Sequence, residues 1–195
     1  DGYSLGKAYQ DFDNVYSNLI GENVNAGIFD LDINPESISR FKVVVAPCSR
    51  FMDRKTQQIL LNYIEHGGNV VCFPEIPGYD WDESRVDVLK NALGRGKTRL
   101  SPSWKTTQIG EGCLIEMSQS DYSRDSLAEL IRFLSIQSPV TSKGPRVKTT
   151  LLSKDSNQLY FVVNAADEEI DTELRFAEIR EGTLENVLYH DWPLI

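Results

Sequence analysis

The stretch from residue 41 to residue 77 constrains the fold most, because two short apolar runs flank a helical pattern in it. Residues 41–46 and 69–73 are rich in valine and do not alternate with polar side chains, which is typical of strands buried on both faces of a parallel sheet. Between them, Asp53 can cap the start of a helix, and Gly67 and Gly68 can end it. The sequence therefore predicts a βαβ unit with a right-handed crossover, and with it an α/β fold in which helices cover both faces of a mostly parallel sheet.

The region before this unit predicts a helix, a strand and a polar connection. Apolar side chains recur at helical spacing over residues 6–22, residues 24–31 have a strand-like pattern, and residues 32–40 are polar and contain Pro35. Doubly wound folds usually begin with a strand rather than a helix. Either the opening strand belongs to a longer parent chain or this sheet lacks it. Because the chain also begins with Asp1 instead of Met, we expect it to be a fragment of a longer protein.

The region after the unit predicts the remaining elements of the same domain. Residues 74–84 contain two prolines and a glycine, which favour a solvent-facing loop. A helix is predicted over residues 84–93, an antiparallel hairpin bordering the sheet over residues 105–117, and a last helix over residues 123–134. Residues 95–103, between the helix at 84–93 and the hairpin, are basic and polar. These elements complete a predicted α/β domain over residues 1–138.

A change of composition marks a second domain. Residues 139–145 predict a linker, because Pro139, Gly144 and Pro145 lie among Ser, Thr and Lys. Beyond them the hydrophobic period changes to two, which predicts four strands, at residues 147–152, 158–164, 172–176 and 184–189. The sequence therefore predicts a small, β-sandwich-like domain over residues 146–195, truncated because a closing strand is expected beyond its end.

Charge and apolar run lengths narrow the classes of partner. The formal net charge is -9, which repels phosphate backbones and anionic membranes. The apolar runs cover only a few residues, whereas a membrane helix needs about 20. We therefore expect neither nucleic acid nor a membrane as partner.

The cysteines bear on the cellular compartment. Cys48, Cys72 and Cys113 are odd in number and scattered, which favours free thiols over a disulfide framework. Free thiols persist in a reducing compartment. We therefore expect a cytoplasmic protein, with secretion as the alternative.

Cys72 is a candidate nucleophile, because it ends a predicted buried strand at the carboxyl edge, where open α/β sheets place their sites. A nucleophile elbow needs small neighbours and a base within hydrogen-bond reach. Cys72 instead stands between Val71 and Phe73. The sequence favours a buried thiol, and we predict no catalytic residue.

The two histidines give little support to a metal or cofactor site. His66 falls in the last turn of the central helix, where the helix dipole favours a cation, and His190 falls in the all-β region. The chain has no CxxC, HxxxH or HExxH spacing and no phosphate-binding glycine motif. We therefore expect no metal and no cofactor.

The loop after the second strand holds the candidate binding residues Tyr79, Asp80, Trp81 and Asp82. The two rings can stack on a pyranose or anchor a protein contact, and the carboxylates can bind a sugar hydroxyl or Ca²⁺. A structural alternative is that Asp82 or Ser84 caps the following helix. The loop is our candidate interface or sugar contact.

A family resemblance is carried by four segments, FKVVVAP, LLNYIEHGG, NVVCFPEIP and GEGCLIEM. Together they resemble the glutamine-amidotransferase-like domain of large bacterial β-galactosidases in glycoside hydrolase families 35 and 42. The segment VKTTLLSKDSNQLYFVVNAADEE resembles the small β domain that follows it in those enzymes. The resemblance spans most of the chain and implies a flavodoxin-like fold of the class I glutamine amidotransferase type.

The resemblance also implies what the chain lacks. Amidotransferases of this type use an elbow cysteine flanked by glycines and a downstream His-x-Glu, whereas Cys72 has no flanking glycine and His190 is followed by Asp191 and Trp192. In the β-galactosidases the hydrolytic carboxylates belong to a separate barrel, which needs about 250 residues. Neither activity is therefore expected of this chain alone.

We therefore expect a non-catalytic structural or oligomerisation module of a β-galactosidase-type enzyme, which docks on the catalytic barrel of its parent chain or on a sister subunit. Two alternatives stay open. One is a carbohydrate-binding module that contacts a galactoside through Tyr79 and Trp81. The other is a stand-alone α/β hydrolase or transferase that uses Cys72 or the loop around Asp80.

Overall fold

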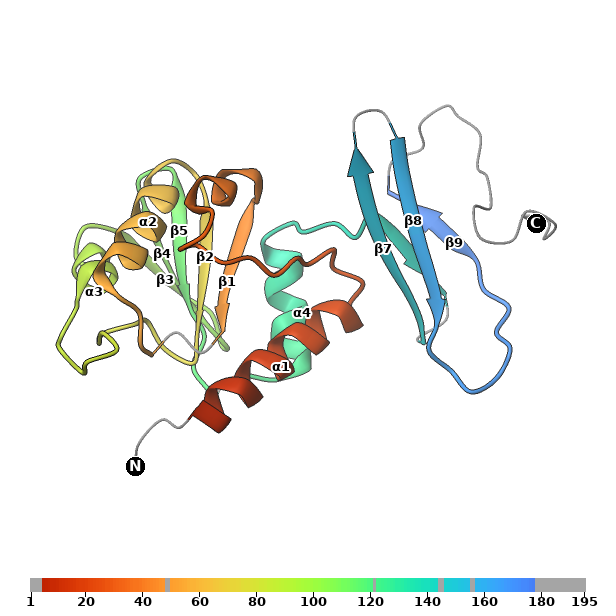
Figure 1. Ribbon diagram of the computed structural model, residues 1–195, viewed down its shortest axis with the longest axis horizontal. Helices are drawn as coiled ribbons and strands as arrows, with labels where there is room; N and C mark the ends of the chain where they lie inside the picture. The colour runs from red at the N-terminus through yellow and green to blue at the C-terminus, as the bar shows by residue number, and fades with distance from the viewer. Residues whose placement is uncertain (1–4, 48–49, 121, 144–145, 155–156, 178–195) are drawn as a thin grey trace. The chain divides into compact units, whose positions relative to one another are not determined.

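The computed structural model describes residues 5–47, 50–120, 122–143, 146–154 and 157–177, and the chain divides into two compact units, Asp1–Ile136 and Gln137–Ile195. The first unit contains helices and strands, and the described part of the second contains strands (Figure 1).

Helices and strands largely alternate along the chain in the first unit. In order they are α1 (Leu5–Gly21), the 3-10 helix η1 (Pro35–Arg40), β1 (Val43–Pro47), α2 (Arg54–Glu65), β2 (Asn69–Phe73), α3 (Val88–Leu93), β3 (Lys97–Leu100), β4 (Lys105–Ile109), β5 (Gly112–Glu116) and α4 (Arg124–Phe133). Among the described residues, no helix is both long and apolar enough to cross a membrane.

The strands of the first unit form one five-stranded sheet in the order β1-β2-β5-β4-β3. β1 pairs parallel with β2 and β2 pairs parallel with β5, whereas β4 is antiparallel to both β5 and β3. Four of the five strands therefore point the same way, which confirms the predicted mixed α/β architecture with a mostly parallel sheet.

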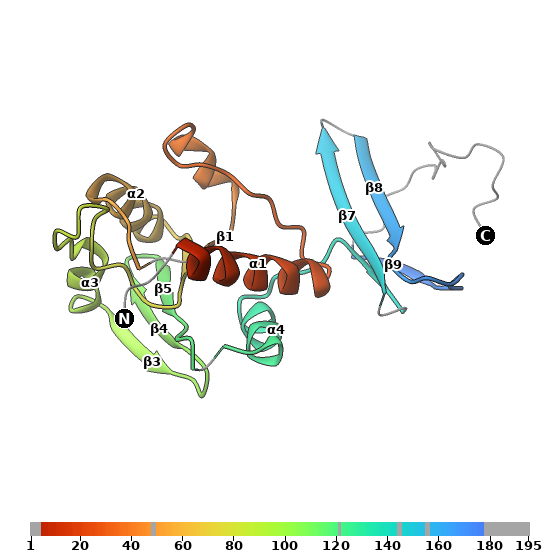
Figure 2. The same ribbon diagram turned by 60° about the horizontal axis from the view of Figure 1, so that its bottom comes forward.

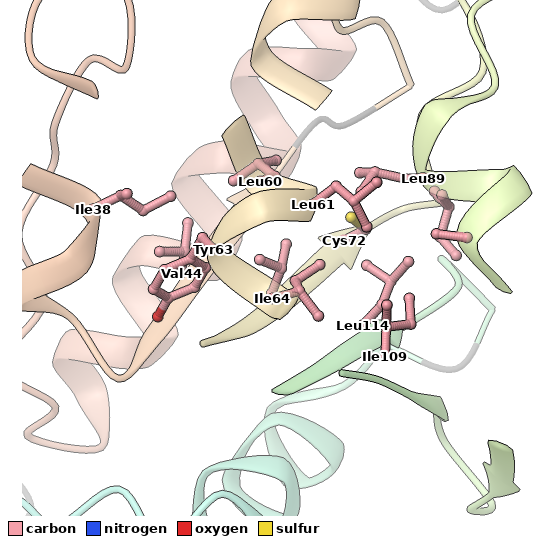
Figure 3. Packing of buried hydrophobic residues seen from close by; sticks show 13 residues of the cluster. Ile38, Val44, Leu60, Leu61, Tyr63, Ile64, Cys72, Leu89, Ile109 and Leu114 are labelled. Carbon is pink, nitrogen blue, oxygen red and sulfur yellow. The ribbon is translucent and has the colours of Figure 1, made fainter. Parts of the chain in front are cut away.

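Helices cover both faces of this sheet (Figure 1). On one face, Val70 and Cys72 of β2 pack with side chains of α2 and α3, a cluster shown in Figure 3. On the other face, Val71 and Phe73 pack with side chains of α1 and α4. Strand β2 therefore feeds both hydrophobic cores, as its uninterrupted apolar sequence predicts.

Helix α2 begins and ends where the sequence predicts. The carboxylate of Asp53 accepts hydrogen bonds from the backbone N–H of Thr56, at 2.9 Å, and from its hydroxyl, at 2.6 Å. Partial burial alone would raise the pKa of Asp53, but these hydrogen bonds outweigh it and the pKa lies below its ordinary value. The helix ends at Glu65, and Gly67 then takes a φ of 98°, a left-handed conformation that favours glycine.

Residues 24–31 form no strand, so that prediction is wrong. Val24 and Ala26 pack against the cluster that contains α1 and α4, whereas Phe29 and Leu31 pack against the cluster that contains α2 and α3. The segment therefore passes from one face of the sheet to the other. Its apolar side chains contact two different cores, and their spacing in the sequence resembles that of a strand.

Three further details of the first unit differ from the sequence prediction. β3 lies within the basic stretch and has four exposed side chains, so no hydrophobic pattern marks it. α3 begins at Val88, later than predicted. The predicted hairpin of β4 and β5 is present, but β5 lies inside the sheet beside β2 rather than at its border, because β3 adds the outer strand.

The described part of the second unit contains two antiparallel strand pairs. Its described strands are β6 (Val140–Ser142), β7 (Val147–Lys154), β8 (Asn157–Asn164) and β9 (Leu174–Phe176), and β6 pairs with β9 while β7 pairs with β8. β6 lies within residues 139–145, which the sequence predicts as a linker. The hydroxyl of Thr149 donates to the carbonyl of Val140 at 2.8 Å and so joins the two pairs. The predicted strand at residues 184–189 and His190 lie outside the described residues.

The turn between β4 and β5 packs tightly on the end of α2. The backbone N–H of Glu111 donates to the carbonyl of Glu65 at 3.3 Å, and that of Cys113 donates to the carbonyl of Gly68 at 3.2 Å. A β-carbon on Gly112 would stand 2.0 Å from the Gly68 carbonyl oxygen and 2.4 Å from that of Ile64. The hairpin can therefore reach this position only with glycine at residue 112.

Replacing Gly112 with alanine should lower the free energy of unfolding by about 1–3 kcal/mol, because the obstructing atoms belong to the backbone. Urea unfolding followed by circular dichroism measures the change. Gly94→Ala is the matched control, because its nearest neighbour would lie at 3.7 Å and its φ of -65° suits alanine. Equal unfolding midpoints for the two variants would contradict the close packing of Gly112 against the carbonyls of Gly68 and Ile64.

Candidate functional site

Three aromatic side chains gather at the carboxyl ends of β1 and β2, the edge where open α/β sheets place binding sites. Phe51 follows β1, and Tyr79 and Trp81 follow β2. The rings of Phe51 and Trp81 are stacked, with centroids 6.3 Å apart and planes at 21°, and the centroids of Phe51 and Tyr79 are 6.2 Å apart. We call these three residues the aromatic surface.

The two loops that carry the aromatic surface are joined by backbone hydrogen bonds. The N–H of Met52 donates to the carbonyl of Tyr79 at 2.8 Å, and the N–H of Gly78 donates to the carbonyl of Arg50 at 3.4 Å. Residues 76–78 are buried, so the loop predicted to face solvent does so only at its tip. The loop is therefore anchored at its base and presents its rings from there.

A buried amide ties the same region to α2 and α3. The side chain of Gln57 on α2 is fully buried, and its Nε2 donates to the carbonyls of Met52, at 2.9 Å, and Val86, at 3.2 Å. Its Oε1 accepts from the backbone N–H of Leu89 at 3.3 Å. One side chain therefore holds the segment after β1, the segment after β2 and the start of α3.

The rings of the aromatic surface remain available for contact. Trp81 is 74% exposed and Tyr79 is 41% exposed. Two cations flank them: the guanidinium of Arg50 lies 5.8 Å from the centroid of Phe51, and Nζ of Lys90 lies 6.0 Å from that of Tyr79. This arrangement can bind a flat apolar face, either the ring of a sugar or a protein surface.

Asp80 and Asp82 bond to their own loop. Oδ1 of Asp80 accepts from the N–H of Trp81 at 2.6 Å, and Oδ1 of Asp82 accepts from the N–H of Ser84 at 2.9 Å. The side-chain and backbone hydrogen bonds from Ser84 lower the pKa of Asp82. No group of three or more potential metal ligands occurs within the described part of the chain, so the Ca²⁺ interpretation gains no support.

Neither Asp82 nor Ser84 caps the following helix, so that structural alternative is wrong. The residue at the cap position of α3 is Asp87, and its side chain makes no capping hydrogen bond. The helix begins later because residues 78–86 form backbone bridges, among them one between Tyr79 and Arg85.

The other residues that the sequence singles out, the cysteines and His66, do not belong to the aromatic surface. Cys72 has no exposed surface and belongs to the core between the sheet and α2 (Figure 3). His66 is exposed at the end of α2, with Nδ1 2.8 Å from the carbonyl oxygen of Asn62. Cys113 is half-buried, and burial raises the pKa of its thiol. Cys48 lies outside the described residues.

A separate groove of about 1040 Å³ runs between η1 and α2. Its lining mixes apolar, amide and charged side chains, including Phe41, Lys42, Gln58, Asn62 and His66. No sequence motif marks this groove, because it arises from the packing of a 3-10 helix on a helix.

Sequence reasoning missed Phe51, Arg50 and Lys90, which complete the aromatic surface. The available signal was positional: parallel neighbours β1 and β2 end at the same edge, so the residues after β1 meet those after β2. Lys90 follows from no local pattern, because it reaches Tyr79 from α3.

Comparison with known families gives one match to a family model. The family described as "GLMA-like, second domain" matches residues 4–126. A β-1,2-glucosyltransferase of Ignavibacterium album is 27% identical over 124 residues, which cover 63% of this chain and 17% of that protein. An exo-β-D-glucosaminidase of Pyrococcus horikoshii is 31% identical over 77 residues, which cover 39% of this chain and 10% of that protein. The chain thus spans only a small part of the length of these relatives.

Solved structures share the fold. A GH42 β-galactosidase from G. stearothermophilus superposes with a TM-score of 0.70 at 16% identity, covering 91% of this chain and 34% of that one. A β-galactosidase from Bacillus circulans sp. alkalophilus gives 0.68 at 14% identity, covering 84% and 33%. A GH42 exo-carrageenase from Bacteroides ovatus gives 0.53 at 15% identity, covering 87% and 22%. At such identities the likeness shows the fold alone.

The thiol of Cys72 should react with a maleimide at least about a hundredfold more slowly in the native protein than in urea, because reaction requires an exposed thiolate. Peptide mapping by mass spectrometry separates Cys72 from Cys48 and Cys113 and so measures its rate alone. Rapid native labelling of Cys72 at neutral pH would contradict its burial and restore it as a candidate nucleophile.

Proposed function

The chain belongs to the family of GLMA-like second domains, and from this membership we propose that it is a non-catalytic accessory domain of a β-galactosidase-type glycoside hydrolase of family 35 or 42. The observation that carries the proposal is the extent of the match, which spans residues 4–126 and thus nearly all of the first unit. The relatives extend far beyond that region. A catalytic barrel of about 250 residues would not fit in 195, so the proposal puts the hydrolytic carboxylates elsewhere in a longer parent protein.

The fold proposed for the first unit is flavodoxin-like, of the class I glutamine amidotransferase type. The parallel strands β1, β2 and β5 with helices on both faces support it. Amidotransferase chemistry is not part of the proposal, because the only described cysteine at the end of a parallel strand, Cys72, is closed off inside the core. The same burial argues against a stand-alone hydrolase or transferase that uses this thiol.

The role proposed for the module is docking, on the catalytic barrel of the parent or on a sister subunit. The aromatic surface supports it, because Tyr and Trp are enriched where proteins meet and the loop base is held by the buried amide of Gln57. A pre-ordered loop loses little conformational entropy on binding. Lys90 offers positive charge beside the rings, which would suit an acidic group on the partner, whereas the charge of Arg50 is paired with Glu75 at 3.7 Å.

A carbohydrate contact is the second candidate. The exposure of the Trp81 ring favours it, because a flat indole face beside exposed Asp82 can stack on a galactoside while the carboxylate binds a hydroxyl. A cytoplasmic location remains part of the proposal, since Cys72 and Cys113 are free thiols in the structure.

The 195-residue chain by itself should hydrolyse neither an aryl galactoside nor glutamine, because it is too short for a barrel with paired carboxylates and its described residues hold no accessible Cys-His-Glu set. Chromogenic galactoside release and glutamate release measure the two activities. Turnover that survives repurification and disappears in Cys72→Ala or Asp82→Ala would overturn the non-catalytic assignment.

Replacing Trp81 with alanine in the parent enzyme should weaken the docking contact by about 2 kcal/mol or more, roughly thirtyfold, because a central Trp anchor typically contributes that much. Sedimentation velocity of the parent measures its assembly, and protease protection of the boundary near residue 137 reports docking on the barrel. Tyr9→Ala is the matched control, because Tyr9 is equally exposed, at 74%, but lies on α1.

Calorimetric titration of the 195-residue chain with galactose separates the two candidates. Unchanged assembly and protection in Trp81→Ala would reject the docking role. Galactose binding that Trp81→Ala abolishes and Tyr9→Ala retains would favour the carbohydrate contact.

A further inference from the structure

Strand β3 forms an open edge of the sheet. It is the last strand in the order β1-β2-β5-β4-β3, and Figure 2 shows it at the rim of the unit. Its inner side pairs with β4 from Lys97 opposite Gln108 to Leu100 opposite Lys105. Its outer backbone groups meet no strand within the described residues, so they can pair with an added chain.

This edge carries positive charge in an acidic chain. Lys97 and Arg99 lie two positions apart on β3, and Arg95 lies in the turn just before the strand; all three are exposed, and none forms an ion pair within the described part of the chain. The formal net charge of the chain is -9, so the chain as a whole repels an acidic partner, and these cations would attract one locally. We call these three residues the basic edge.

The complementary pattern occurs in residues 167–171 of the same sequence. Asp167, Glu169 and Asp171 also occupy every second position, are exposed, and form no ion pair in the described ranges. Residues 166–172 belong to no helix or strand, whereas the backbones of Ala165 and Glu173 at either side are bonded to Arg146 and Lys143, so the acidic run is anchored at both ends and its own residues are in no sheet. We call Asp167, Glu169 and Asp171 the acidic run.

The two patterns match in period. In an extended chain, alternate side chains lie on one side at a spacing of about 7 Å, so a strand formed by the acidic run beside β3 would set carboxylates opposite Lys97 and Arg99, with Arg95 close to the end of the added strand. The intervening positions match as well, because Leu100, which is 72% exposed, would face the side on which Ile170 lies. Such pairing combines main-chain hydrogen bonds with charge-specific side-chain contacts.

We propose that the basic edge of one copy of this chain binds the acidic run of a second copy, which adds as a strand to β3. Each copy carries both halves of the contact, so pairs or longer assemblies form without another component. The contact is distinct from the aromatic surface, and its failure would leave the proposed accessory function intact. A solely protective role of edge cations against aggregation predicts instead that reversing their charge leaves a monomer unchanged or makes it associate.

Sedimentation velocity of the 195-residue chain over a range of concentrations measures the association. Attraction should be strong at about 0.1 M salt and lost at about 1 M, where the Debye length falls from about 10 Å to about 3 Å. The triple reversal Arg95→Glu, Lys97→Glu and Arg99→Glu should weaken association at least tenfold, about 1.4 kcal/mol. The opposite reversal, Asp167→Lys, Glu169→Lys and Asp171→Lys, should weaken it equally, and a chain with both reversals should associate again.

The control reversal Arg40→Glu, Lys42→Glu and Arg54→Glu changes the net charge by the same amount at other exposed positions and should retain association. Restoration in the doubly reversed chain distinguishes a direct contact from misfolding of either single set. A wild-type chain that stays monomeric at low salt would overturn the proposal. So would equal loss in the control, or binding of a sulfated galactan by the basic edge with no dependence on the acidic run.

Discussion

Burial of β2 on both faces is the constraint on which the first unit depends. Val70 and Cys72 enter one core while Val71 and Phe73 enter the other, so a polar side chain at any of these four positions would weaken the helix layer that it faces. Binding groups are therefore confined to the ends of the strand. At the carboxyl end the chain leaves the sheet, and there the rings of Tyr79 and Trp81 meet Phe51 from the neighbouring strand.

The sequence predicts the secondary structure best where a pattern of residues has a single structural explanation. The valine runs and the Asp53 cap locate β1, α2 and β2, because burial on two faces and a capped helix leave few alternatives. Residues 24–31 mislead because their apolar side chains contact two different cores, and β3 lacks a hydrophobic pattern because its side chains are exposed. Tyr79 and Trp81 can be singled out from their loop, whereas Phe51 and Lys90 join them only through tertiary packing.

The chemistry of the described residues fits the proposed recognition role. Their conspicuous exposed groups are rings and cations, and the thiol of Cys72 is enclosed by the core between the sheet and α2. An α/β fold widely used for catalysis is thus compatible here with a recognition role. The groove between η1 and α2 is not part of this recognition surface, and its mixed lining points to no one class of ligand.

The buried amide of Gln57 limits how this region can vary in evolution. Because its three hydrogen bonds go to backbone atoms of Met52, Val86 and Leu89, the side chains there can vary, but an insertion or deletion that moved one of these backbone atoms would leave a buried donor or acceptor unpaired. The tip between these anchors, from Tyr79 to Arg85, is free of that restriction. Descendants of this domain can therefore change what the tip recognises by insertion or substitution while they inherit the frame that presents it.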